Sequence, residues 1–169
     1  MEVLEQHDEA VRRRVTLFLL FFSSDRCVAA ASVLLSPGRV AFDLCRLWFD
    51  DIYVPSTRYM DGLKGDRSAT DVQQFERAFS SDELLSLERF HAFLELRLDM
   101  LSDAHRRDRI FPPSDLWDNV MRDARYLAET LEPNHTQREA LLSWLVSVLS
   151  DPEKARAALG ASEGLFLKS

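Results

Sequence analysis

The stretch that decides the fold is Val-Thr-Leu-Phe-Leu-Leu-Phe-Phe at residues 15–22. It closes a block, beginning at Val3, in which apolar side chains recur at the three- and four-residue spacing of one helix face. Within 15–22 the helix is apolar nearly all round, which is typical of a helix at the centre of a bundle. In isolation, the Val- and Phe-rich run is also compatible with a strand. We expect a central core helix over about residues 3–22.

The same helical pattern recurs along the rest of the chain. The six prolines and five glycines fall between the apolar-periodic blocks, where these residues end helices. The sequence therefore predicts an all-α, single-domain bundle over residues 1–169, with seven or eight helices and negligible strand. It also predicts a long ordered loop at 55–70 and a C-terminal tail at 160–169. The expected helices after the first are 25–35, 39–53, 71–79, 81–102, 114–131, 136–149 (opened by a Thr136–Glu139 capping box) and 152–160.

The composition and net charge argue against two classes of function, nucleic-acid binding and membrane anchoring by basic residues. The chain has 169 residues, of which 46% are hydrophobic and 29% charged, as in a folded globular domain. Its formal net charge is −7, from 21 Lys and Arg against 28 Asp and Glu. A surface that is negative on average repels phosphate and anionic lipid, so nucleic-acid binding and a polybasic membrane anchor are not expected.

One segment imitates a targeting signal. Arg12–Arg14 precede the apolar run 15–22, but the residues before them are acidic, and the run is interrupted at Asp25, well short of the roughly 18 residues of a membrane span. We interpret it as a core helix whose arginines lie on the solvent-exposed face. Cys27 and Cys45 lie among apolar neighbours and are expected to be buried free thiols, which fits a cytoplasmic protein.

One predicted helix carries a pattern of metal-ligand type. Glu88 and His91 are three residues apart and Glu95 follows by one turn, so all three share a helix face. Carboxylate-bridged di-iron bundles use Glu-x-x-His in this way, but they need two such motifs and two further glutamates. The favoured interpretation is a core-edge His91, hydrogen-bonded to Glu88 or Glu95, on a helix whose core face is widened by Phe90, Phe93 and Met100. The alternative is a divalent-metal site at Glu88, His91 and Glu95.

The predicted loop and the end of the preceding helix form the second candidate site. Aromatic, acidic and basic side chains gather where regular periodicity is lost, and long loops in compact domains often carry function. The cations suit a small anionic ligand, whereas the nearby aspartates would instead neutralise them and make the segment a structural clasp. The candidate ligand-binding residues are Asp50, Asp51, Tyr53, Arg58, Tyr59, Lys64 and Arg67.

These observations favour a binding, interaction or regulatory module with a protein partner. Self-association as a dimer is expected, because the most apolar helices exceed what one small core absorbs. No cofactor is predicted for this function. The alternative is a metal- or cofactor-dependent helical enzyme that uses the Glu88, His91 and Glu95 face.

Overall fold

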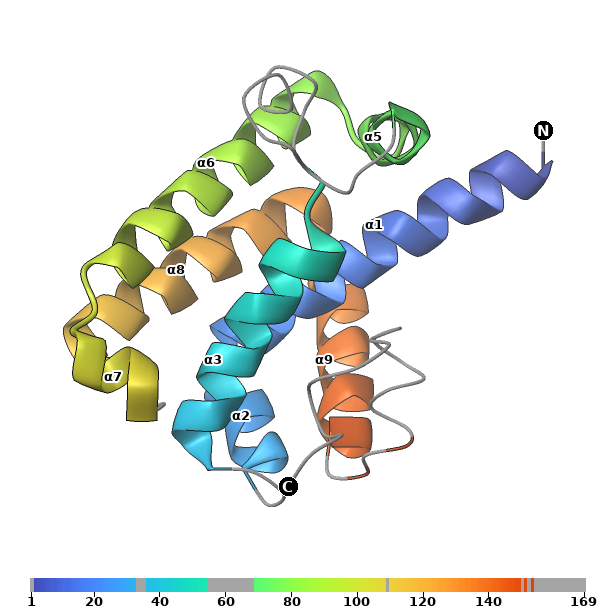
Figure 1. Ribbon diagram of the computed structural model, residues 1–169. Helices are drawn as coiled ribbons and strands as arrows, with labels where there is room; N and C mark the ends of the chain where they lie inside the picture. The colour runs from blue at the N-terminus through green and yellow to red at the C-terminus, as the bar shows by residue number, and fades with distance from the viewer. Residues whose placement is uncertain are drawn as a thin grey trace.

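The computed structural model describes residues 2–32, 36–54, 69–108, 110–149, 151 and 153. These residues form α-helices, one π-helical turn and no strand, which confirms the all-α prediction (Figure 1). The expected helix at 152–160 and most of the loop at 55–70 lie outside the described residues. The elements are α1 (Glu2–Ser23), α2 (Asp25–Ala31), α3 (Pro37–Leu47), η1 (Trp48–Ile52), α5 (Ala69–Arg77), α6 (Ser81–Asp99), α7 (Asp103–Asp108), α8 (Ser114–Leu131) and α9 (His135–Leu149).

Helix α1 is the central element of the bundle. It packs against α8, α9, α2, α5 and η1, and its N-terminal end projects from the rest of the molecule (Figure 1). Every side chain from Leu17 to Phe22 is at most 6% exposed. Because these side chains point in all directions around the helix, neighbours on every side are needed to remove them from water. The prediction of a central helix is confirmed, and the strand alternative at 15–22 is wrong.

The predicted helix at 39–53 divides into two parts. It begins at Pro37, where the Ser36 hydroxyl accepts a hydrogen bond from the Arg39 amide (3.3 Å). The α-helix ends at Leu47, and residues 48–52 form the π-helical turn η1, closed by a hydrogen bond from the Tyr53 amide to the Trp48 carbonyl (3.0 Å). A π turn inserts one extra residue and rotates the side chains that follow. It thereby directs Tyr53 into the core.

Two other predicted boundaries are corrected. Helix α6 ends at Asp99, and the basic segment after it forms the separate short helix α7. The predicted capping box at Thr136–Glu139 is wrong, because α9 begins at His135 and Asn134 is its cap: the side-chain oxygen of Asn134 accepts from the Gln137 amide (3.1 Å). Asn is a stronger N-cap than Thr, and Asn134 lies three residues after the end of α8, where its backbone can adopt the conformation of a cap.

Arg12 of α1 ties three other helices together. Its guanidinium donates two hydrogen bonds to the Glu83 carboxylate, at 2.7 and 3.0 Å. It also donates to the carbonyl of Ala78, just after α5, and to that of Leu131, the last residue of α8, each at 3.0 Å. The guanidinium carbon lies 5.3 Å from the centre of the Phe79 ring. One side chain therefore donates hydrogen bonds to the carboxylate at the start of α6 and to carbonyls at two helix ends that have no partner within their own helices.

This cluster, the Arg12 clamp, corrects the expectation that Arg12–Arg14 form a solvent-exposed face. Arg13 is exposed and lies over Trp144, but Arg12 and Arg14 are half-buried. Glu83 also caps α6. Its carboxylate accepts a hydrogen bond from the Ser80 amide (2.8 Å), and its own amide donates to the Ser80 hydroxyl, so the two residues form a capping box. The hydrogen bond from Arg12 lowers the pKa of Glu83 below its ordinary value of 4.5.

Substitution of Arg12 by Met tests the clamp. The change keeps most of the aliphatic stem but leaves Glu83 and two carbonyls without their donor, so we expect the free energy of unfolding to fall by about 2–4 kcal/mol. The matched control Arg13→Met removes only an exposed contact with Trp144 and should cost about 1 kcal/mol or less. Denaturant unfolding followed by circular dichroism measures both, and equal losses in the two variants would contradict the clamp.

The clamp also predicts an acid dependence. Because the folded-state pKa of Glu83 is depressed, its contribution to stability is fully present above about pH 4.5 and is lost as the pH falls through the folded-state value. Arg12→Met should remove this part of the acid destabilisation. The difference between the unfolding free energies of the wild type and of Arg12→Met, measured from pH 7 to pH 3, should therefore become smaller at low pH.

Candidate functional site

An aromatic cluster surrounds His91 where η1 meets α6. The His91 ring stacks on Tyr53, with ring centres 4.4 Å apart, and meets the edge of Phe49 at 5.0 Å. Tyr53 in turn stacks on Trp48, with centres 5.6 Å apart. The Trp48 indole Nε1 donates a hydrogen bond to His91 Nδ1 (3.3 Å). The cluster therefore links the π turn to α6 through one hydrogen bond and several ring contacts.

His91 is held in its neutral form. Desolvation by burial lowers its pKa from 6.5 to about 4, and its side chain is only 14% exposed. Because Nδ1 accepts from Trp48, the neutral ring carries its proton on Nε2, which lies 3.9 Å from the nearest Glu95 oxygen. The predicted core-edge position is confirmed. The predicted partner is wrong, because the hydrogen bond goes to Trp48 and Glu95 lies beyond hydrogen-bond distance.

The side chains proposed for a metal site do not converge. Glu95 is largely exposed, Glu88 is half-buried, and His91 Nδ1 is already occupied by Trp48. Within residues 2–32, 36–54, 69–108 and 110–149, no three His, Cys, Asp or Glu side chains are grouped so that they could hold a metal ion. A divalent metal at these residues therefore has no support from the described geometry.

The structure separates the predicted ligand-binding residues. Asp50 is exposed, whereas Tyr53 is buried in the aromatic cluster. Asp51 is half-buried and lines a cavity of about 180 Å³ that it shares with His7 and Asp71. The remaining predicted ligand-binding residues, Arg58, Tyr59, Lys64 and Arg67, lie outside the described residues.

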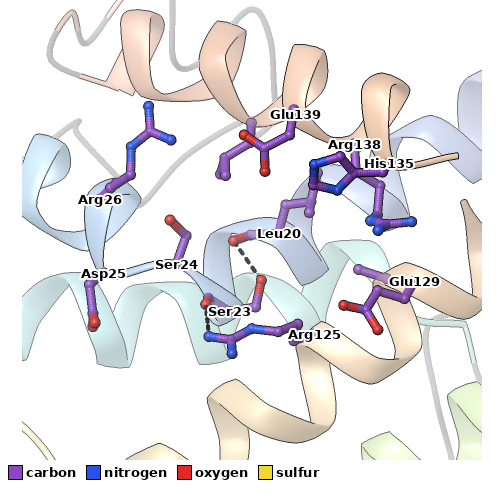
Figure 2. A pocket seen from close by; sticks show the side chains of 12 residues that line it. Leu20, Ser23, Ser24, Asp25, Arg26, Arg125, Glu129, His135, Arg138 and Glu139 are labelled. Carbon is purple, nitrogen blue, oxygen red and sulfur yellow. Dashed lines mark hydrogen bonds between the residues drawn. The ribbon is translucent and has the colours of Figure 1, made fainter. Parts of the chain in front are cut away.

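A larger open cavity of about 340 Å³ lies between the end of α1, α2, α8 and α9 (Figure 2). Its arginines do not converge on one point, and two of them serve as helix caps. Arg125 donates to the carbonyl of Ser23 at the end of α1 (3.4 Å), and Arg138 donates to the carbonyl of Glu132 at the end of α8 (2.7 Å). Cations at helix C-termini stabilise the unpaired carbonyls there. The geometry of this cavity thus indicates structural capping.

The most distinctive surface is the outer face of α6, which we define by Leu85, Phe93, Leu96 and Met100. At about 100° per residue these side chains lie within roughly 80° of one another, on the side opposite the buried Leu87 and Leu94. Phe93 is 50% exposed and Met100 is 72% exposed. The expectation that both widen the core face is therefore wrong, because their angular position places them on the other side of the helix.

A groove borders the outer face where α6 packs on α8, two helices that lie side by side in Figure 1. It has a volume of about 320 Å³. Phe90 and Leu127 supply its buried apolar side chains, and Phe93 and Tyr126 are its exposed rings, with Tyr126 74% exposed. The outer face and the groove together present aromatic and aliphatic side chains to solvent over the length of α6. Exposed apolar side chains gathered on one face in this way are typical of an interaction site.

No protein-family model, no curated protein and no solved structure matches this chain. Among the described residues, no helix is both long enough and apolar enough to cross a lipid bilayer. Function is therefore inferred from geometry and charge alone.

The His91 cluster makes a prediction about pH. Because the folded-state pKa is about 4 and the unfolded value is near 6.5, the unfolded chain takes up a proton first, and stability falls as the pH drops from about 6.5 to about 4. His91→Asn keeps an acceptor for Trp48 at the position of Nδ1 but does not titrate. We expect its unfolding free energy to vary less over this range, measured by denaturant unfolding at each pH.

The control for this measurement is His135→Asn, the same substitution at an exposed imidazole. A wild-type profile that is flat between pH 6.5 and pH 4.5, or one that His91→Asn does not alter, would contradict a buried neutral His91.

Proposed function

We propose that this protein is an interaction module that binds a protein partner through the outer face of α6 and the adjoining groove. The observation that carries the proposal is the second apolar stripe of α6, opposite its core stripe. A surface helix ordinarily keeps that side polar. An apolar residue there brings no benefit to the isolated fold, whereas a partner that covers it removes it from water.

The size of the surface suits a binding role. Complete burial of one Leu, Phe or Met side chain stabilises a complex by about 1.5–3 kcal/mol. Four such side chains on the outer face, with Tyr126 beside them, represent a gross gain on the order of 5–10 kcal/mol before the cost of association. Because much of that gain is offset by lost translational and rotational freedom, the apolar stripe alone supports only a weak, reversible interaction, and polar contacts at the groove must add to it for a stable complex.

The other candidate functions have less support. The metal-dependent enzyme would use Glu88, His91 and Glu95, which form no metal-holding group in the described structure. The anionic-ligand site depends on Arg58, Lys64 and Arg67, which lie outside the described residues. The expected dimer stays a prediction that sedimentation measurements test directly.

Site-specific photo-crosslinking tests the proposal. A benzophenone amino acid is placed at Leu96 of the full chain, and separately at Ala29, an exposed residue of α2, and both proteins are produced in the native cells and irradiated. We expect a discrete protein adduct from position 96 and none from position 29, because only the first lies on the outer face.

A second substitution shows whether the adduct depends on the apolar stripe. Met100→Asp places a charge one turn beyond position 96 on the outer face, and it should abolish the adduct while leaving the thermal unfolding midpoint within about 2 °C, since the side chain is 72% exposed. An adduct that survives Met100→Asp, or equal adducts from positions 96 and 29, would refute the proposed function.

A further inference from the structure

The outer face of α6 is not uniformly apolar, because Arg89 lies in its middle. At about 100° per residue, Arg89 falls between Leu85 and Phe93 in angle. Arg89 is exposed and forms no ion pair or hydrogen bond with the described residues. The same arginine lines the groove between α6 and α8. A guanidinium in this position can bind a carboxylate through two parallel hydrogen bonds.

The far side of the groove is also basic. Arg122 of α8 lines the groove, and its side chain is 71% exposed, 3.7 Å from one oxygen of Asp123. Asp123 is the carboxylate that lines this groove, and its other oxygen accepts a hydrogen bond from Arg97. The groove thus carries two arginines and one already paired aspartate in a chain of net charge −7. Its local charge is opposite in sign to that of the whole protein.

The opposite edge of the outer face is acidic, and this limits pairing with a second copy. Glu88, Glu95 and Asp99 lie about 100° around the helix from the centre of the stripe. In a two-fold dimer with α6 helices parallel, Arg89 meets the same arginine of the other copy near the axis. With the helices antiparallel, each acidic edge meets the other acidic edge. The antiparallel arrangement therefore places like charges together along the edge. The parallel one does so at Arg89 but also sets each acidic edge against the basic groove of the other copy, so the oligomeric state is measured in the test below.

From this charge arrangement we propose that the outer face of α6 binds an acidic amphipathic segment of a different protein, in which apolar side chains alternate with Asp or Glu. This inference rests on the proposed function and specifies its partner. An apolar side chain of the segment enters the groove between Phe93 and Tyr126. A carboxylate of the segment pairs with the Arg89 guanidinium, and a second one reaches Arg122 at the far side of the groove. The acidic remainder of the surface repels the segment elsewhere and thereby fixes where it binds.

The experiment selects peptides from a phage-displayed library of random 16-residue sequences on the full-length protein. We expect the recovered peptides to carry Asp or Glu within a few positions of Leu, Phe or Trp. A synthetic, fluorescently labelled copy of one of them is then titrated by anisotropy. Arg89→Glu and Phe93→Asp should each weaken binding at least about tenfold. Arg26→Glu, the same charge change at an exposed position of α2, should leave the affinity within about twofold.

The outcomes separate this inference from the proposed function. Peptides whose binding is weakened by Phe93→Asp but which are neutral or basic, or whose affinity is unchanged by Arg89→Glu, would contradict an acidic partner. They would still support the proposed interaction surface. Recovery of no peptide, or only of peptides that ignore Phe93→Asp, overturns both. Sedimentation of the wild type and of Phe93→Asp tests whether a second copy occupies this face. We expect the same oligomeric state for both proteins, and a dimer abolished by Phe93→Asp would make a second copy the occupant and overturn the inference.

Discussion

The rest of the structure depends on the hydrogen bonds of one side chain, Arg12. Helix α1 runs through the middle of the bundle, and its apolar half contacts neighbours on all sides without specifying their ends. The Arg12 guanidinium fixes where these helix ends lie, because it donates hydrogen bonds to Glu83 at the start of α6 and to the carbonyls of Ala78 and Leu131. Hydrophobic burial is non-directional, whereas these bonds have fixed geometry. The clamp therefore sets the relative positions of α5, α6 and α8 around the core.

The position of α6 in this arrangement explains why its outer face is open. One side of α6 packs inward through Leu87, Phe90 and Leu94, and α8 covers only one flank. The opposite side retains Phe93 and Met100, which no described helix covers. A bundle that buries one stripe of a doubly apolar helix leaves the other stripe exposed, and this exposed stripe is the surface through which we propose that a partner binds. The basic groove beside it has a charge complementary to the acidic partner that we propose.

Errors in the sequence-based expectations have physical causes at particular residues. The sequence predicts correctly that His91 lies at the core edge, but its hydrogen-bond partner is Trp48, 43 positions earlier in the chain. The apolar character of Phe93 and Met100 favours the core, but their angular positions on the helix separate them from Leu87 and Leu94. Arg12 looked like part of a solvated basic run, since nothing local distinguishes it from Arg13 and Arg14.

The sequence by itself determined the helical class, the central position of the run at 15–22 and the approximate extent of most helices. These features follow from periodicity, capping residues and the placement of Pro and Gly, all of which act within a few residues along the chain. Only the tertiary structure decided the Arg12 clamp, the bond from Trp48 to His91, and the open basic groove between α6 and α8. Each depends on side chains distant in sequence, and their proximity is set by how the helices pack, which no local pattern encodes.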